Sequence, residues 1–177
     1  QTTVPSSERA GTMLGIVEFL QGNNVEAVKH FEQFVDPETA SPTALQMFAM
    51  AELNLNQPQK VLNQLSKDID GSSDAKLVAL FGIASVSANE PEQGEGYLKK
   101  AIELDPNDGR VRLALVRLYN AQGNFDEGLA QAIAAFKSQP EDALVQAAYV
   151  EQLMRLEQLA KAADVIRGIQ SSYPNSQ

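Results

Sequence analysis

The stretch that decides the fold is Gly22–Ala27, with the sequence GNNVEA. Four further stretches align with it, namely NQPQKV at Asn56–Val61, NEPEQG at Asn89–Gly94, GNFDEG at Gly123–Gly128 and EQLAKA at Glu157–Ala162. The last residues of these stretches are separated by 34, 33, 34 and 34 positions. A fixed period of this length predicts an array of about five helix–turn–helix units.

Two further columns of residues have the same spacing. One column holds large residues, each followed by a small or branched one, and consists of Leu14, Phe48, Phe81, Leu115 and Tyr149. The other consists of Phe31, Leu65, Leu98, Ala132 and Ile166. We expect the small residues that end each aligned stretch to lie where two antiparallel helices cross. The large residues should fill the gap between one hairpin and the next, because a single hairpin cannot bury its apolar face alone.

The pattern predicts an all-α protein with ten helices in a single array over residues 1–177. Proline and aspartate or asparagine near the ends of the units are typical of helix stops and caps. The repeat units are predicted at 8–41, 42–74, 75–108, 109–142 and 143–176. The helices are predicted at 7–21, 24–35, 42–55, 58–68, 74–88, 91–104, 109–122, 125–138, 142–156 and 159–172.

Composition excludes several classes of protein. Apolar residues make up 44% of the 177, which can form a core, and the net charge of -9 argues against a nucleic-acid partner. The chain has no cysteine, so it has neither disulfides nor thiolate metal sites. No apolar run approaches the roughly 18 residues that a membrane span needs. We therefore expect no direct membrane span in this segment.

The residues that could carry chemistry are few. His30 is the single histidine, which cannot by itself form a catalytic triad or a histidine-rich metal site. Acidic pairs occur at Asp105/Asp108 and Glu141/Asp142, where they are better explained as caps of the following helices than as an acid–base pair. The sequence contains neither a phosphate-binding loop nor a dinucleotide fingerprint. We predict no enzyme activity and no catalytic, cofactor-binding or metal site.

The columns resemble the tetratricopeptide repeat (TPR), a 34-residue unit with Leu-Gly, Ala, Phe, Ala and Pro at set places. Leu14-Gly15, Ala27 and Phe31 match it in the first unit, and Tyr97–Asn107 matches the end of a typical unit almost residue for residue. The usual tryptophan is absent. The resemblance covers about residues 8–176 and implies a right-handed superhelical α-solenoid that binds protein partners in a concave groove.

A narrower similarity is to the TPR lipoproteins of bacterial exosortase (PEP-CTERM) systems and to TPR subunits of exopolysaccharide-export machines. This similarity rests on the general residue pattern of segments such as Ala114–Gly128. It implies a periplasmic or outer-membrane-attached protein. Without it, a cytoplasmic location is expected, and the residues themselves leave the compartment unknown.

In the family, the first helix of each unit lines the groove. Here the resemblance implies a groove that is apolar at its N-terminal end and basic or polar further along, where Arg117 and Asn120 could receive a carboxylate. An alternative is that its apolar members pack on neighbouring units. The candidate partner-binding residues are Arg9, Ile16, Phe19, Met50, Lys76, Ile83, Arg110, Arg117, Asn120 and Glu151.

The leading functional hypothesis is a scaffold that binds a partner peptide or helix in this groove. Its finer form places the scaffold in bacterial protein sorting or exopolysaccharide export. The alternative is a structural spacer or assembly subunit of a larger machine with no discrete ligand site. We expect the segment to belong to a longer protein. We also expect apolar faces at both ends of the array, through which the chain could associate with itself.

Overall fold

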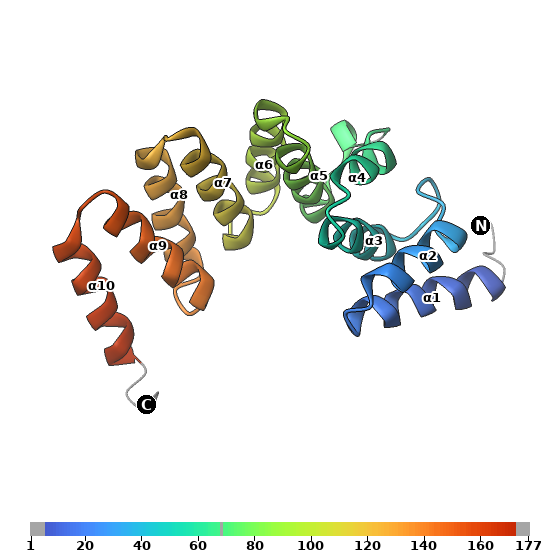
Figure 1. The fold of residues 1–177 in the computed structure, drawn as a ribbon, viewed down its shortest axis with the longest axis horizontal. Coiled ribbons are helices and arrows are strands. Elements are labelled where there is room, and N and C mark those ends of the chain that lie inside the picture. The colour runs from blue at the N-terminus through green and yellow to red at the C-terminus, as the bar shows by residue number, and fades with distance from the viewer. Residues whose placement is uncertain (1–5, 68, 173–177) are drawn as a thin grey trace. The chain divides into compact units, whose positions relative to one another are not determined.

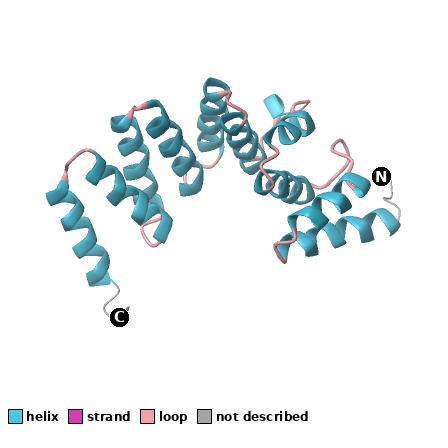
Figure 2. Cartoon of the chain, in the orientation of Figure 1, coloured by secondary structure: helices cyan, strands magenta, loops and turns pink. Residues whose placement is uncertain are grey.

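The computed structural model describes residues 6–67 and 69–172, and over these residues every regular element is a helix (Figure 2). Successive α-helices pair as hairpins, and one short 3-10 helix, η1, separates α4 from α5 (Figure 1). The predicted all-α class is confirmed, as are ten α-helices within the described residues. Their bounds are α1 Ser6–Leu20, α2 Asn24–Phe34, α3 Pro42–Asn54, α4 Pro58–Leu65, η1 Ile69–Gly71, α5 Ala75–Ser87, α6 Pro91–Leu104, α7 Gly109–Gln122, α8 Phe125–Ser138, α9 Ala143–Arg155 and α10 Leu159–Ser172.

The fourth helix is the one predicted boundary that is clearly wrong. The sequence predicts a helix over 58–68, but α4 ends at Leu65. Beyond it, the side chain of Ile69 is buried in η1. The carbonyl oxygens of Ile69 and Asp70 accept hydrogen bonds from Nζ of Lys100 at 3.1 and 2.7 Å. Tertiary bonds from α6 therefore hold this backbone in place of a longer α4.

The tight turns inside the hairpins share one backbone feature. A residue with positive φ follows each first helix, and its φ lies between 56° and 84°. Glycine adopts this left-handed conformation at little cost, asparagine at a modest one, and glutamate less readily. The positive φ thus explains the glycines and asparagines that begin the aligned stretches. Its members are Gly22, Asn56, Asn89, Gly123 and Glu157.

Side-chain caps begin four of the first helices. Asp74 accepts from the backbone N–H of Lys76 and of Leu77, each at 3.0 Å, which satisfies two donors that the first turn of a helix leaves free. The same arrangement recurs at Asp108 and Asp142, and Ser41 accepts from one backbone N–H, that of Ala44. Asp108 and Asp142 each belong to one of the acidic pairs, and their observed contacts are those of caps.

The chain divides into two compact bodies. The N-terminal body comprises residues 1–104 and contains α1–α6, and the C-terminal body comprises residues 105–177 and contains α7–α10. Within each body the core lies between the helices of a hairpin and between successive hairpins, as the repeat requires.

The small column lies at the helix crossings, as the sequence predicts. Ala27 and Val61 are fully buried, and Gly94, Gly128 and Ala162 are buried.

The two columns of larger residues are buried inside the bodies, or half-buried at Tyr149, but the prediction fails at one member of each. Leu14 is 51% exposed, whereas its equivalents Phe48 and Phe81 are buried. Ile166 is 39% exposed, whereas its equivalent Leu98 is fully buried. Residues of these columns fill the space between two hairpins, so a member is buried only where a neighbouring hairpin covers it. The outer faces of α1 and α10 are therefore apolar and exposed.

Candidate binding surfaces

A cavity of about 750 Å³ lies beside α1 in the N-terminal body. It brings together the predicted groove residues Arg9 and Ile16 with the end of α2 and the segment that leads into α3. The two helices approach closely here, because a Cβ atom on Gly11 would lie 2.1 Å from the ring of Phe34. Its lining residues are Glu8, Arg9, Thr12, Met13, Ile16, Gln33, Phe34, Val35, Asp36, Thr39, Ala40, Ser41 and Ala44.

The other groove candidates of this body lie at matching positions on α1, α3 and α5. Met50 and Lys76 are exposed, and Phe19 and Ile83 are half-buried. A hydrogen bond ties α3 to α5, since Nε2 of Gln46 donates to the Asp74 carboxylate at 3.0 and 3.2 Å. Met50 and Lys76 are therefore presented by helices that a side-chain hydrogen bond joins.

The predicted basic and polar region of the C-terminal body is divided. Arg110 lines a polar cavity of about 610 Å³ together with four carboxyl groups, those of Asp105, Asp108, Glu141 and Asp142. Arg117 is exposed on α7.

Asn120 is half-buried, and its Oδ1 lies in the core without a hydrogen-bond partner. This oxygen is therefore turned away from the exposed face on which the sequence places Asn120. Of the three predicted polar groove residues on α7, only the two arginines are exposed.

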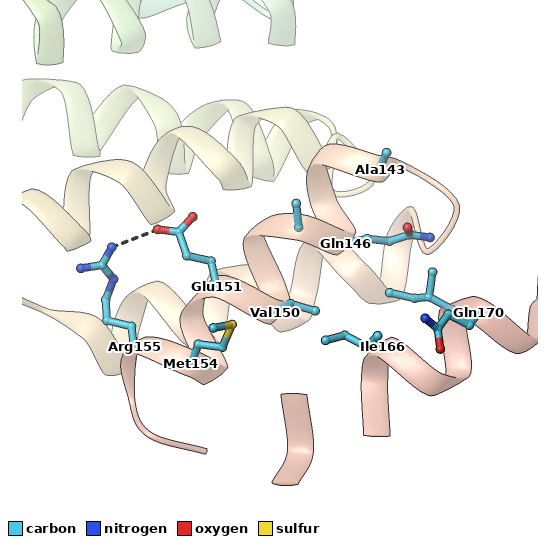
Figure 3. Close-up of a pocket in the computed structure, with 10 residues that line it drawn as sticks. Ala143, Gln146, Val150, Glu151, Met154, Arg155, Ile166 and Gln170 are labelled. Carbon is cyan, nitrogen blue, oxygen red and sulfur yellow. Dashed lines mark hydrogen bonds and ion pairs between the residues drawn. The ribbon is translucent and has the colours of Figure 1, made fainter. Parts of the chain in front are cut away.

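A second cavity, of about 740 Å³, lies between α9 and α10, and we call it the tail cavity (Figure 3). Figure 3 shows Val150 and Ile166 reaching toward each other from the two helices. The predicted groove residue Glu151 lies at its edge, in an ion pair with Arg155 at 2.9 Å. The guanidinium carbon of Arg155 also lies 5.3 Å from the centre of the Phe125 ring. The lining residues are Ala143, Gln146, Ala147, Val150, Glu151, Met154, Arg155, Ile166, Ile169 and Gln170.

A buried carboxyl group in the N-terminal body was not singled out from the sequence. Glu52 on α3 is 2% exposed, and its Oε2 has no hydrogen-bond partner. Burial raises the pKa of Glu52 from 4.5 to about 7; nearby Lys60 lowers it and Glu32 raises it further. The sequence gives little signal for this burial, because the same column holds Glu18 in the first unit and Ser85 in the third, and only the last two units have large side chains there, Tyr119 and Leu153.

Gln152 on α9 is the corresponding polar residue of the C-terminal body. It is fully buried, and neither atom of its side-chain amide has a hydrogen-bond partner. Its equivalents in the other units are apolar, namely Val17, Ala51, Ala84 and Leu118. A comparison within that column would have identified Gln152 before the structure did.

Neither a metal site nor a membrane span is found in the part of the chain that the structure describes. Across 6–67 and 69–172, no three histidine, aspartate or glutamate side chains are grouped so that they could hold a metal ion. Among the helices of the same residues, none is both long enough and apolar enough to cross a membrane.

Comparison with known proteins supports the repeat assignment. A family model described as a tetratricopeptide repeat matches residues 85–149. No curated protein matches the chain.

Several solved structures are similar to it over nearly its whole length. The thermophilic TPR protein TTC0263 of Thermus thermophilus is 18% identical, with a TM-score of 0.74, over 96% of this chain and 93% of that one. PilF of Pseudomonas aeruginosa is 16% identical, with a TM-score of 0.71, over 97% of this chain and 79% of that one. MamA (MSR-1) is 18% identical, with a TM-score of 0.69, over 98% of this chain and all of that one. The chain thus has the fold of TPR solenoid proteins.

Proposed function

We propose that the chain is a non-enzymatic scaffold that binds an extended peptide or an amphipathic helix of a partner protein along its first helices. The observation that carries the proposal is the cavity beside α1, in which Arg9, Thr12 and Ile16 line one space of about 750 Å³. These residues stand at positions two, five and nine of the first repeat unit, which the resemblance to the tetratricopeptide repeat assigns to the groove. The proposed groove therefore coincides with a hollow in the surface.

The chemistry of this cavity suits an amphipathic partner. Ile16, Phe34 and Val35 contribute apolar side chains, and Arg9 and Asp36 contribute charges of opposite sign. Apolar anchors spaced three or four residues apart on a partner helix could enter the apolar part. The charged groups could then fix the direction in which the partner lies.

The same face continues on the next first helices of the N-terminal body. Met50 on α3 is 42% exposed, and a flexible thioether side chain adapts to partners of different shape. Ile83 on α5 adds a half-buried apolar side chain, and Lys76 adds an exposed charge. In the C-terminal body we assign the same role to Arg110, Arg117, Asn120 and Glu151. The net charge of -9 should favour the approach of partners with basic flanks.

A peptide selection tests the proposal and does not require the partner to be identified. Random peptides displayed on phage are selected on the wild-type chain, and the Kd of enriched peptides is measured by fluorescence polarisation. We expect Ile16→Asp and Met50→Asp each to weaken binding about tenfold, which corresponds to about 1.4 kcal/mol, because a carboxylate then replaces an apolar contact. Arg117→Ala should have a smaller effect, since its charge is exposed and screened.

Leu104→Asp is the matched control. Leu104 is 41% exposed, almost the same as Met50, but it lies at the end of a second helix, α6. Its substitution should leave the Kd unchanged. If no peptide is enriched, or if the groove variants bind as the control does, the chain is better explained as a structural spacer without a discrete ligand site.

A role in bacterial protein sorting or exopolysaccharide export is the finer part of the proposal. It rests on the narrower sequence similarity alone and gains no support from the comparisons. A signal peptide followed by a lipid-accepting cysteine in the gene, upstream of Gln1, would support it. Binding of peptides by the groove does not depend on it.

A further inference from the structure

One side of α1, which we call the head face, is apolar and uncovered. It consists of Ala10, Met13, Leu14 and Val17, all of which are exposed. Met13 is 59% exposed and Val17 is 43% exposed. The equivalent residues of α3 and α5 are buried or half-buried.

The equivalent side of α9 shows what such a face does. Its residues are Val145, Ala148, Tyr149 and Gln152, which hold the same places in their repeat unit as the head face holds in the first. Val145 and Ala148 pack with Leu113 of α7 and Ala135 of α8. Tyr149 lies against Phe136 with the ring centres 5.2 Å apart. This side of a first helix is therefore the one that packs on the preceding hairpin.

The tail cavity is the equivalent docking surface for another helix of this kind. Its lining residues include the equivalents, one repeat period later in the sequence, of the residues that α9 covers on α7 and α8. Ala147 and Ile169 correspond to Leu113 and Ala135, and Ile166 corresponds to the fully buried Ala132. The surface of α7 and α8 that α9 covers therefore has an equivalent on α9 and α10, and that equivalent surface is left uncovered.

We propose that α1 of a second copy of this chain docks in the tail cavity and makes a head-to-tail contact. The contact would continue an interface that the C-terminal body already contains between α9 and the α7/α8 hairpin. By the repeat register, Met13 of one copy would lie against Ala147 and Ile169 of the other. Val17 takes the place of Gln152, so this contact buries an apolar side chain where the internal interface buries an unpartnered amide. Because the two surfaces differ, each added copy leaves one head and one tail free, and assembly extends or closes into a ring.

The test uses one blocked head and one blocked tail. Val17→Asp places a carboxylate on the head face, and Ile166→Asp places one in the tail cavity. The wild-type mass measured by sedimentation velocity should rise with concentration from micromolar upward, whereas each variant alone should remain monomeric. A mixture of the two should form a 1:1 dimer and nothing larger, because only one intact head and one intact tail are present.

Other outcomes identify other occupants. A wild-type chain that stays monomeric at every concentration overturns the proposal. Self-association of Ile166→Asp alone would indicate a symmetric head-to-head contact and would also overturn it. Met13→Lys and Met154→Lys form a second pair at exposed positions, should an aspartate variant fail to fold.

The docking surfaces share Met13 and Glu151 with the proposed peptide groove, but variants at residues that belong to only one of them separate the two proposals. Met50→Asp should weaken peptide binding and keep its self-association, while Val17→Asp should lose self-association and keep peptide binding. Leu104→Asp should change neither.

Discussion

The α5/α6 and α7/α8 hairpins carry a glycine at the same place in the repeat, and the two glycines have different neighbours. A Cβ atom on Gly94 would lie 2.4 Å from Cγ2 of Val86 and 2.9 Å from the carbonyl oxygen of Gly82. A Cβ atom on Gly128 would lie 3.0 Å from Oε1 of Gln152 and 3.2 Å from Oδ1 of Asn120. The first glycine therefore faces backbone and a branched side chain, and the second faces the ends of two amide side chains.

This difference shows that residues in the same column can be small for two different reasons. In α5/α6 the backbones themselves approach, because Gly82 faces Gly94 and neither has a side chain to separate the helices. In α7/α8 the residue that corresponds to Gly82 is Val116, and the space beside Gly128 is taken by amides. Backbone cannot move away from an added methyl group, whereas the end of a side chain can.

The largest effect is expected for Gly94→Ala. The added methyl group would overlap Val86 and the backbone of α5, and we expect the free energy of unfolding to fall by about 3 kcal/mol. Urea denaturation followed by circular dichroism measures it. Gly96→Ala on the same helix is the control, because open space surrounds Gly96. That substitution should stabilise the chain by about 0.5–1 kcal/mol through helix propensity. Equal effects of the two substitutions would contradict a close backbone approach.

The next effect concerns the buried polar groups, Glu52 in one body and Gln152 in the other. The pKa of Glu52 is raised from 4.5 to about 7 by burial, so the folded state binds a proton that the unfolded state releases between these values. The free energy of unfolding should therefore fall by about 2 kcal/mol as pH rises from 5 to 8.

Glu52→Gln removes the titrating group and keeps its shape. The variant should lose most of this pH dependence and be the more stable protein at pH 8. Urea midpoints at pH 5 and 8 measure the difference. Substitution of Gln152 by Leu is the comparison, since an amide does not titrate, and it should leave the pH dependence as it is in the wild type. Parallel pH curves for Glu52→Gln and the wild type would refute the assignment.

The smallest effect is expected for Gly128→Ala. The contact with the two amide oxygens is tight, but helix propensity gains up to about 1 kcal/mol, so the net change should stay below about 1 kcal/mol. In a Gln152→Ala background the nearer of the two amides that face the methyl group is gone. There the same substitution should become stabilising by about 0.5–1 kcal/mol. A double-mutant cycle measured by urea denaturation gives the coupling between the two sites. Additive effects would mean that Gln152 does not constrain Gly128.

Much of the fold could be predicted because the same residue pattern recurs in five units. The columns that contain Ala27 and Phe31 give the hairpins and their turns, and the predicted bounds of α6, α7, α8 and α10 agree with the structure. The exception is the end of α4, where Lys100 binds the backbone carbonyls of η1. Such a contact joins residues about 30 positions apart, and no local pattern encodes it.

Less of the candidate site could be predicted, because exposure depends on what covers a residue. Ala79 and Leu113 stand at groove positions in the repeat, yet both are buried. Leu14 and Ile166 stand at core positions, yet both are exposed. The resemblance places Arg9 and Ile16 in the groove, and the structure adds the cavity that contains them both. Their role in binding remains a prediction.

The sequence by itself determined the period, the helices and the places that require small residues, since these depend on local propensities and on contacts repeated every 33 or 34 positions. Tertiary structure alone decided which glycine faces backbone and which faces an amide, which carboxyl group is buried, and which apolar faces are left open. These features depend on the distance between particular atoms of helices that are separate in the chain. A repeat fixes the kind of neighbour that each residue has, and only the packed structure fixes how close that neighbour lies.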